Sequence, residues 1–448
     1  MVLLSVGFHQ YKRICVLFLA KERQLGKKLD DVLFQGTSIN CTTASWSPSK
    51  DKTCHFQNLC YSHTDDFYVF VHSPNSEQVL ISADSITTEP QLPLTSVTDS
   101  TYYFKCVNVT NEMVRKDVMD DNFIFMKGSH IVYTRFVPNN IFHVFHDELL
   151  PIYFTLRRYT NPKDYNSTRL FLYDNSDGGS FSFLHDLFSY LPPVFKYELA
   201  LEPPKTLTCF EKATVGLVRE SIWYQYGVNK PEGPIENSTV TSEHIRNFTT
   251  FVKERLGISD TCPKENFGIL LSRKINRRLL NEKEFRSAIS DQLQFDMVEL
   301  SLESNSLSYI MEKVSCARLV VGVHGALLIT TMFLQPSSVL LEIFPYAINP
   351  DHRTHYKTLV QLPGMGITYL SWRNTDKLKA VTHPSAIPRL GGIIHLPAKE
   401  QERIMSVTEV AHNKTGKDPE WRFFLYQDTI VDIPGIIDLL SKLYLKKQ

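Results

Sequence analysis

Four side chains that can bind or transfer a proton crowd into one short apolar run of the sequence. They are His143, His146, Asp147 and Glu148. His143 lies three residues before His146 and four before Asp147, so on a helix these three share one face. A carboxylate beside imidazoles is typical of general acid–base catalysis, in which a side chain takes a proton from a reacting hydroxyl. A polar helix end packed on a core is an equally good explanation of these residues alone.

A helix is expected to carry these groups. Asn139 or Asn140 suits the N-cap position, and the apolar pattern over residues 141–156 predicts the helix itself. Pro151 cannot donate to the carbonyl of Asp147, and its ring crowds that turn, so the helix should kink at Asp147. Proton-handling groups beside a kink indicate the wall of a cleft.

The composition argues against a partner held by bulk charge. The 448 residues contain 48 Lys plus Arg and 48 Asp plus Glu, so the chain has no net charge. We therefore expect no nucleic-acid partner, and any anionic ligand must be held by local groups. The hydrophobic fraction of 43% allows a large core, and the length favours two or three domains.

The second half of the chain alternates apolar strands with helices. The expected strands are 268–272, 295–300, 319–323, 339–344 and 367–372, and the expected helices are 281–293, 306–316 and 326–334. Continuous apolar strands separated by helices of this length predict a parallel sheet covered on both faces. This predicts a Rossmann-like α/β domain, whose ligands bind at the carboxyl ends of the strands.

Two loops at those strand ends carry residues suited to a diphosphate. The loop 272–278 holds four cations, among them Arg273 and Arg277, whose fork geometry matches phosphate oxygens. The third strand ends at His324-Gly325-Ala326, where small residues let a ligand approach the backbone and the start of a helix favours an anion. A solvated basic loop would explain the first pattern without a ligand.

A buried carboxylate is the third feature of this edge. Glu342 stands in the apolar strand 339–344, where an ionised carboxylate is unstable unless it is paired or binds a ligand. The ribose diol of a nucleotide is one such ligand. An ion pair with one of the arginines is the alternative.

Together these loops predict a site for a nucleotide diphosphate. The sequence has no GxGxxG motif, no phosphate loop of the GxxxxGK[ST] type, and no Asp-x-Asp between apolar strands to hold a divalent metal. Cations of the protein would then stabilise the leaving diphosphate. The pattern predicts a two-domain, metal-independent glycosyltransferase, with the kinked helix of the first domain facing the nucleotide across a cleft.

These residues also resemble a known family, glycosyltransferase family 61. The resemblance extends over roughly residues 100–445 and rests first on Asn140-x-x-His143-x-Phe145-x-Asp147, Ser272-Arg273 with Arg277, Asn281-Glu282, His324-Gly325-Ala326 and Glu342. It implies the GT-B fold, with two Rossmann-like domains facing across a cleft. It also implies an inverting reaction, UDP-GlcNAc as the donor, no metal cofactor, and a place in the endoplasmic reticulum lumen or membrane.

Longer matches indicate one branch of that family. They are 133–136, 143–151, 224–227, 330–334, 344–352 and 426–429. By this resemblance the chain moves GlcNAc to the 4-hydroxyl of O-linked mannose on a glycoprotein such as dystroglycan. The alternatives are direct GlcNAc transfer to Ser or Thr of EGF-like domains, as in another branch, and a non-catalytic lumenal paralogue.

The roles and domains follow from this reading. We expect Asp147 to be the base or to orient it, with His143 and His146 fixing its geometry or contacting the acceptor. Arg273 and Arg277 would neutralise the diphosphate. His324-Gly325-Ala326 would bind it from the start of the helix, and Glu342 would hold the ribose. The expected domains are a degenerate or missing anchor at 1–35, an acceptor-side α/β domain at 36–235 and a nucleotide-sugar domain at 236–448. We expect no fibronectin type III domain, and a homodimer is left open.

The cysteines and glycosylation sequons favour a secretory lumen. Eight cysteines are compatible with a few disulfides, although their spacing fixes no pairing. The candidate N-glycosylation sites are Asn40, Asn108, Asn166, Asn237, Asn247 and Asn413.

Overall fold

The computed structural model divides the chain into two compact units. Unit 1 is Met1–Ile222 and unit 2 is Trp223–Gln448. The structure describes residues 32, 35–43, 52–62, 67–72, 92–97, 103–104, 106–110, 123–174, 179–189, 191–196, 207–228, 230–259, 262 and 266–444. The roles assigned to the predicted domains 36–235 and 236–448 stay predictions, and most of the predicted anchor region 1–35 lies outside the described residues.

Unit 1 is built on a mixed sheet of eight strands. Its order is β6-β3-β2-β10-β7-β8-β9, and β1 pairs with β2. The strands are β1 (Ser38–Thr43), β2 (Lys52–Ser62), β3 (Phe67–His72), β6 (Cys106–Thr110), β7 (Phe123–Tyr133), β8 (Arg169–Leu172), β9 (Val194–Phe195) and β10 (Leu207–Val215). Strands β10, β7, β8 and β9 run parallel, whereas β2 is antiparallel to β1, β3 and β10. Unit 1 is therefore α/β, but with a mixed sheet in place of the fully parallel Rossmann pattern that we expected.

A long helical segment follows β7 and carries the predicted acid–base residues. It consists of α4 (Ile141–His143), the π-helix η2 (Val144–Leu149) and α5 (Leu150–Tyr159). Asn140 is the N-cap, as predicted, and its side-chain oxygen accepts from the Phe142 amide at 3.0 Å. At Asp147, where we predicted a kink, the helical hydrogen-bonding pattern changes from α to π.

Unit 2 contains the predicted parallel sheet. Its order is β14-β13-β15-β16-β17, and all four pairings are parallel. The strands are β13 (Phe267–Leu271), β14 (Asp296–Leu300), β15 (Leu319–Val323), β16 (Val339–Phe344) and β17 (Thr368–Arg373). Every residue of β13, β15 and β16 is buried, as continuous apolar strands require. The five strands match the predicted ones to within one residue at every end.

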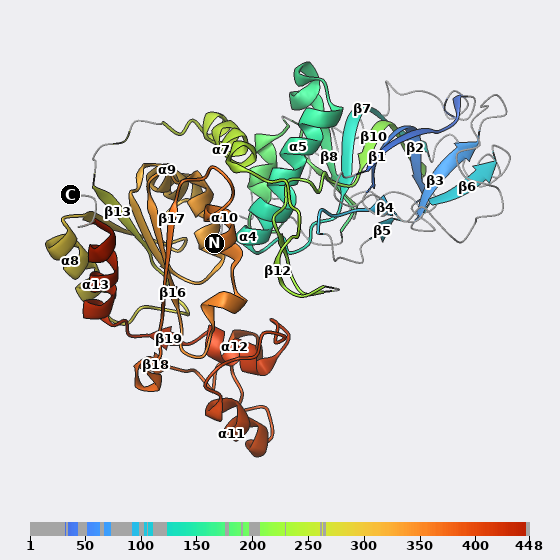
Figure 1. The fold of residues 1–448 in the computed structure, drawn as a ribbon. Coiled ribbons are helices and arrows are strands. Elements are labelled where there is room, and N and C mark those ends of the chain that lie inside the picture. Colours follow the sequence, from blue (N-terminus) through green and yellow to red (C-terminus); the bar gives the residue numbers. More distant parts are fainter. Residues whose placement is uncertain are drawn as a thin grey trace, which may run out of the picture. The chain divides into compact units, whose positions relative to one another are not determined.

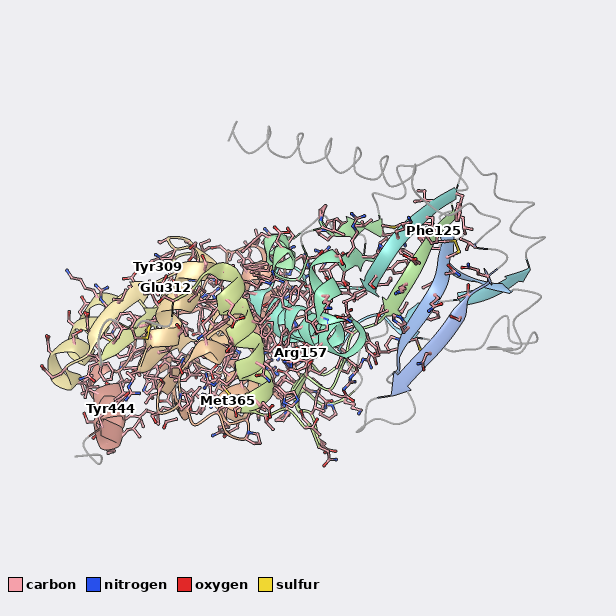
Figure 2. All side chains as sticks on the ribbon, turned by 90° about the horizontal axis from the view of Figure 1, so that it is seen from above. Phe125, Arg157, Tyr309, Glu312, Met365 and Tyr444 are labelled. Atoms are coloured by element: carbon pink, nitrogen blue, oxygen red, sulfur yellow. A yellow bond between two sulfur atoms is a disulfide. The ribbon has the colours of Figure 1, made fainter. Side chains whose placement is uncertain are left out.

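Helices cover this sheet on both faces (Figure 1). On one face lie α8 (Glu282–Leu293) and α13 (Ile433–Tyr444), whose apolar side chains share a core cluster with alternate residues of β13, β15 and β16. Tyr444, labelled in Figure 2, packs edge-on against Phe295 of this cluster, with the ring centroids 5.2 Å apart. On the other face lie α9 (Leu307–Cys316) and α10 (His355–Val360).

Further elements of unit 2 lie outside this sheet, and α7 (Ser242–Leu256) is the longest of them, with 15 residues. The others are β11 (Tyr224–Gln225), β12 (Gly233–Pro234), η5 (Ala326–Phe333), η6 (Pro350–His352), η7 (Lys377–Lys379), β18 (Ala380–Val381), η8 (Pro388–Leu390), α11 (Ala398–Ser406), α12 (Pro419–Leu425) and β19 (Asp428–Thr429). The predicted helix at 326–334 is present as η5, but it is a 3-10 helix. Its Thr330 and Thr331 hydroxyls donate to the carbonyls of Leu327 and Leu328 three residues earlier, which suits the tighter turn.

Each unit has a disulfide between described residues. Cys60 pairs with Cys209 across neighbouring strands of unit 1, and Cys262 pairs with Cys316 in unit 2. No helix among the described residues is both long and apolar enough to cross a bilayer. Of the six sequons, Asn40, Asn237, Asn247 and Asn413 are exposed, while Asn108 lies in β6 and Asn166 in the 3-10 helix Pro162–Ser167.

Candidate active site

Asp147 is the centre of a buried hydrogen-bonded cluster in unit 1. His143 Nδ1 lies 2.6 Å from Asp147 Oδ2, and His146 Nδ1 lies 2.5 Å from Asp147 Oδ1. The Asp147 and His146 side chains are buried, whereas 16% of the His143 side chain is exposed. The three side chains therefore lie together as predicted, and His143 is the one of them that solvent reaches.

The two imidazoles control the charge of Asp147. Burial alone would raise the pKa of this carboxyl, but the His146 charge and the hydrogen bonds of His143 and His146 lower the pKa to about 2. Asp147 is thus an ionised carboxylate at neutral pH. Such a weak base is better suited to orienting an imidazole and stabilising its charged form than to taking a proton itself.

The π-helix exists where Pro151 removes a backbone donor. The Leu150 amide donates to the Phe145 carbonyl, five residues back, instead of four. The carbonyl of Asp147 accepts from the Ser96 hydroxyl at 2.6 Å. Ser96 is fully buried, so this hydroxyl supplies a buried donor to a carbonyl whose usual helical donor is missing at Pro151.

A second carboxylate cluster adjoins the first along the chain. Glu148 Oε1 accepts from the Tyr133 hydroxyl at 3.0 Å and lies 2.5 Å from His185 Nε2. The Tyr133 hydroxyl is also 3.2 Å from this His185 nitrogen. Burial and the Glu148 charge raise the pKa of Tyr133 well above its ordinary value. Tyr133, His185 and Ser96 were not predicted from the sequence, and of these only Tyr133 lies in one of the recognised motifs, 133–136.

In unit 2, the predicted donor residues gather at the carboxyl ends of β13 and β15. A Cβ added at Gly325 would lie 2.9 Å from one Arg277 nitrogen and 3.2 Å from one Arg273 nitrogen, so both guanidiniums converge on Gly325. Arg277 also donates to the His324 carbonyl at 2.8 Å. Arg277 has a φ of 54°, an uncommon conformation for a residue other than glycine. Ala326 follows Gly325 as the first residue of η5.

The four cations of the loop 272–278 divide into two kinds. Lys274 pairs with Glu299, and Arg278 pairs with Asp428. Arg273 and Arg277 form no ion pair with any carboxylate that the structure describes; Arg273 instead donates to Asn276, and Arg277 lies over the Tyr426 ring at 5.1 Å. Two converging guanidiniums without a carboxylate partner have the charge and geometry suited to an anion.

The pKa values of these arginines reflect the same arrangement. Burial, and then the charge of Arg273, lower the pKa of Arg277 to about 9. Burial also lowers the pKa of Arg273. Two buried like charges destabilise each other, and an anion bound between them would relieve this repulsion.

Glu342 lies behind His324. It is completely buried, with Oε1 2.6 Å from His324 Nδ1 and Oε2 accepting from the Tyr369 hydroxyl at 2.8 Å. Its partners are therefore His324 and Tyr369 and not an arginine. Ribose binding by Glu342 stays a prediction, and the geometry favours a role in orienting His324. Among the described residues, no group of three or more His, Cys, Asp or Glu could hold a metal ion.

His324 is surrounded by aromatic residues. They were not predicted as site residues from the sequence. The His355 ring lies 5.8 Å from the His324 ring and stacks on Tyr224 at 4.1 Å. The Tyr356 ring lies 5.7 Å from His324. Tyr224 and Tyr426 belong to the motifs 224–227 and 426–429, and these motifs were the sequence signal that could have identified the two tyrosines as site residues.

Comparisons with known proteins identify the family of this chain. The family model described as Glycosyltransferase 61 matches residues 141–341. The Homo sapiens "Protein O-linked-mannose beta-1,4-N-acetylglucosaminyltransferase 2" is 37% identical over 420 residues, which are 93% of this chain and 70% of that protein. The proteins of the same name from Xenopus laevis and Canis lupus familiaris are 36% and 38% identical, covering 94% and 91% of this chain and 71% and 69% of theirs. This chain is therefore a glycosyltransferase and belongs to glycosyltransferase family 61.

Proposed function

We propose that this protein is an inverting, metal-independent enzyme that transfers GlcNAc from UDP-GlcNAc to the 4-hydroxyl of O-linked mannose on a glycoprotein. The observation that carries the proposal is the convergence of Arg273 and Arg277 on Gly325 at the end of a parallel sheet. The names of the relatives supply the donor sugar and the acceptor. We also propose the GT-B arrangement, in which unit 2 binds the donor and unit 1 supplies the base.

The donor diphosphate would lie against Gly325. Arg273 and Arg277 would contact its oxygens, and the first turn of η5 would present its amides. Because Glu342 holds Nδ1 of His324, the Nε2 of that ring would be directed to the ligand. As the bond from the anomeric carbon to UDP breaks, negative charge grows on the diphosphate, and these fixed cations stabilise it where a metal ion would otherwise act.

The base would be His143, oriented by Asp147. The acceptor hydroxyl gives its proton to the imidazole while its oxygen attacks the anomeric carbon on the face opposite UDP, and the electron pair of the broken bond leaves with UDP. The His143 side chain is partly exposed and its Nδ1 is held by Asp147, so Nε2 is the nitrogen that would take the proton. The ionised Asp147 stabilises the imidazolium that forms.

A lumenal compartment fits the covalent structure. The disulfides Cys60–Cys209 and Cys262–Cys316 are typical of proteins folded in an oxidising compartment. The exposed sequons are compatible with the same place. We therefore propose the endoplasmic reticulum as the site of action.

A transfer assay with the purified chain tests this function. The acceptors are an O-mannosyl peptide, the same peptide without mannose, and an EGF-like domain, each with UDP-GlcNAc in the presence and absence of EDTA. We expect a β-1,4-linked GlcNAc on the mannosyl peptide only, at a rate that EDTA does not change. Transfer to the EGF-like domain alone would assign the protein to the other branch, and loss of activity in EDTA would overturn metal independence.

A further inference from the structure

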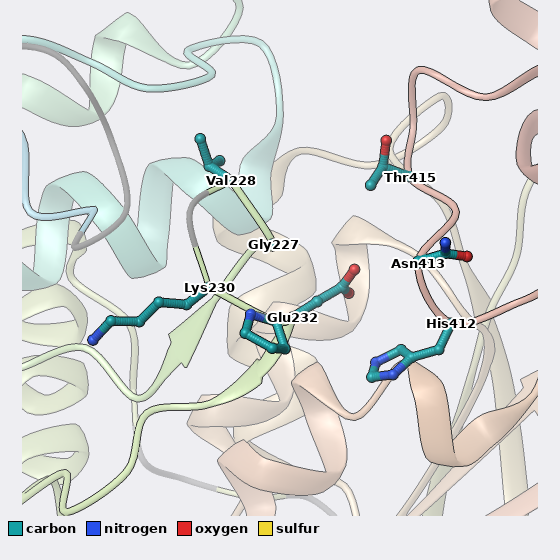
Figure 3. A pocket seen from close by; sticks show the side chains of 8 residues that line it. Gly227, Val228, Lys230, Glu232, His412, Asn413 and Thr415 are labelled. Carbon is teal, nitrogen blue, oxygen red and sulfur yellow. The ribbon is translucent and has the colours of Figure 1, made fainter.

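A polar pocket of about 640 Å³ lies within unit 2, outside the donor cluster (Figure 3). Its walls are the described residues of two loops, 227–228 with 230–232 in the first and 412–415 in the second. The lining residues are Gly227, Val228, Lys230, Pro231, Glu232, His412, Asn413 and Thr415. The volume is within the range of roughly 300–1,000 Å³ of small-molecule sites, so the pocket is large enough for a ligand.

One buried arginine fixes the two walls to each other. Arg353, 3% exposed, donates from one nitrogen to Glu232 in the first loop and from another to the carbonyl of Lys414 in the second. Its guanidinium lies over the Trp421 ring at 5.4 Å. The His412 ring is also supported, because it stacks on His352 at 4.8 Å. The pocket is therefore pre-organised, which reduces the entropy lost on binding.

The pocket is connected to the donor cluster through one carboxylate. Glu232 Oε1 lies 3.4 Å from His355 Nε2 and accepts from the Tyr224 hydroxyl at 3.4 Å. His355 is in turn the neighbour of His324, with ring centroids 5.8 Å apart. A ligand in the pocket would lie two side chains away from the histidine of the donor cluster.

The lining chemistry selects a class of ligand. Glu232 is paired with Arg353, and in Figure 3 the Lys230 side chain points away from the opposite loop. Among the lining residues, therefore, no cation is directed into the pocket to bind an anionic ligand. The opposite loop offers the His412 imidazole and the Thr415 hydroxyl, which both donate and accept hydrogen bonds, whereas the Asn413 side chain points away from the first loop in Figure 3. Groups of this kind match the hydroxyls of a sugar.

We propose that this pocket is a saccharide-binding subsite, which holds sugar residues of the glycoprotein acceptor beside the donor. The proposal rests on the proposed function for the identity of the acceptor, but not for the binding of sugar. A second source of the same chemistry is present in the chain. Asn413 begins the sequon Asn413-Lys414-Thr415 and is exposed, so a glycan on Asn413 would itself start at the wall of the pocket.

The test measures sugar binding without catalysis. The full chain carrying Asn413→Gln has no glycan at this site, and it serves as the reference for two further variants, His412→Ala and His395→Ala. His395 is also exposed but does not line the pocket. Saturation-transfer NMR and calorimetry are run with methyl α-mannoside, methyl β-N-acetylglucosaminide, and the O-mannosyl peptide with and without its mannose.

We expect a sugar probe to bind the reference protein, and His412→Ala to weaken its binding about fivefold, the effect of one lost hydrogen bond, while His395→Ala leaves it unchanged. If the wild-type protein with its Asn413 glycan binds these probes more weakly than the reference, the chain's own glycan occupies the pocket. If no sugar probe binds, or if His412→Ala weakens the mannose-free peptide equally, the proposal is wrong. Failure of the transfer assay with sugar binding intact would instead count against the proposed function alone.

Discussion

At the scale of single residues, the chemistry depends on how Asp147 is surrounded. Two imidazoles occupy its two oxygens, and the pKa of about 2 leaves the carboxylate ionised at every physiological pH. A carboxylate of this kind fixes which nitrogen of His143 carries the proton. In the proposed reaction His143 is then a better base than Asp147. Asp147 is needed because it orients His143 and stabilises the charged form of that imidazole.

Asp147→Asn should therefore lower kcat by about 10²- to 10⁴-fold, the usual contribution of general base catalysis. The KM for UDP-GlcNAc should change little, because the donor residues belong to unit 2. Steady-state kinetics give both values, and thermal unfolding shows whether the variant is folded. Asp186→Asn, at an exposed acid of the same unit, is the control. A folded Asp147→Asn protein with near-normal kcat would remove Asp147 from the mechanism.

His130 gives unit 1 a dependence on pH. It is buried in β7, and burial, followed by the Arg169 charge, lowers its pKa from 6.5 to about 3. Between these two pH values the unfolded chain binds a proton at His130 that the folded chain does not. The contribution of neutral His130 to the free energy of unfolding is therefore present above pH 6.5 and is lost as the pH falls toward 3. Between pH 6.5 and 5 the loss is about 2 kcal/mol.

Replacement of His130 by Leu should abolish this part of the pH dependence. Urea unfolding at pH 7, 6 and 5 measures the slope of the unfolding free energy, which is compared with the wild type and with His395→Leu, a change at an exposed histidine. The expected result is a flatter slope for His130→Leu only. Equal slopes in all three proteins would show that His130 titrates in the folded state as it does in the unfolded chain.

At the scale of elements, the π-helix is the feature that positions the acid–base cluster. Pro151 leaves the Asp147 carbonyl without its usual helical donor, and Ser96 supplies one from 51 residues earlier in the chain. The Glu148–His185–Tyr133 cluster holds the next residue of the same turn. Asp147 is thus fixed through its side chain, its own carbonyl and its neighbour.

Ser96→Ala should lower the free energy of unfolding by about 1–3 kcal/mol, because a buried carbonyl loses its partner. In a Pro151→Ala background the amide of residue 151 can donate to that carbonyl, so Ser96→Ala should then be less destabilising. Urea unfolding of the four proteins completes a double-mutant cycle. Strictly additive effects would mean that Ser96 and Pro151 do not act on the same carbonyl.

The sequence predicted these elements unevenly, for physical reasons. The buried parallel strands of unit 2 are continuous apolar runs, so their bounds were predicted closely, and with them the strand ends that carry Arg273, Arg277 and His324. Pro151 revealed that the helix is perturbed at Asp147, but the form of the perturbation depends on Ser96, a distant partner that no local pattern indicates. The mixed sheet of unit 1 likewise depends on long-range antiparallel pairing.

The same distinction applies to the candidate site. Charged residues in an apolar context were visible in the sequence, because their placement there is unfavourable without a partner. Which partner each one has was not visible. Arg278 and Lys274 resemble Arg273 in the sequence, but Asp428 and Glu299 pair with them in the fold. Glu342 was expected to bind a ligand or an arginine, and it contacts His324 and Tyr369 instead.

At the scale of the whole molecule, the two units carry complementary chemistry. Unit 1 contains the buried acid–base cluster, and unit 2 contains the converging guanidiniums and the polar pocket. Each unit has a disulfide within it and its own hydrophobic core. The proposed reaction uses the acid–base cluster of unit 1 together with the guanidiniums of unit 2, so it needs both units.

The central claim is that Arg273 and Arg277 bind the donor diphosphate, and calorimetric titration with UDP tests it most directly. The titrated proteins are the wild type, Arg277→Ala and Arg389→Ala, the last at an exposed arginine of the same unit. We expect Arg277→Ala to weaken UDP binding at least tenfold, as for the loss of a charge-assisted hydrogen bond, and Arg389→Ala to bind as the wild type does. Unchanged UDP affinity in a folded Arg277→Ala protein would contradict the account.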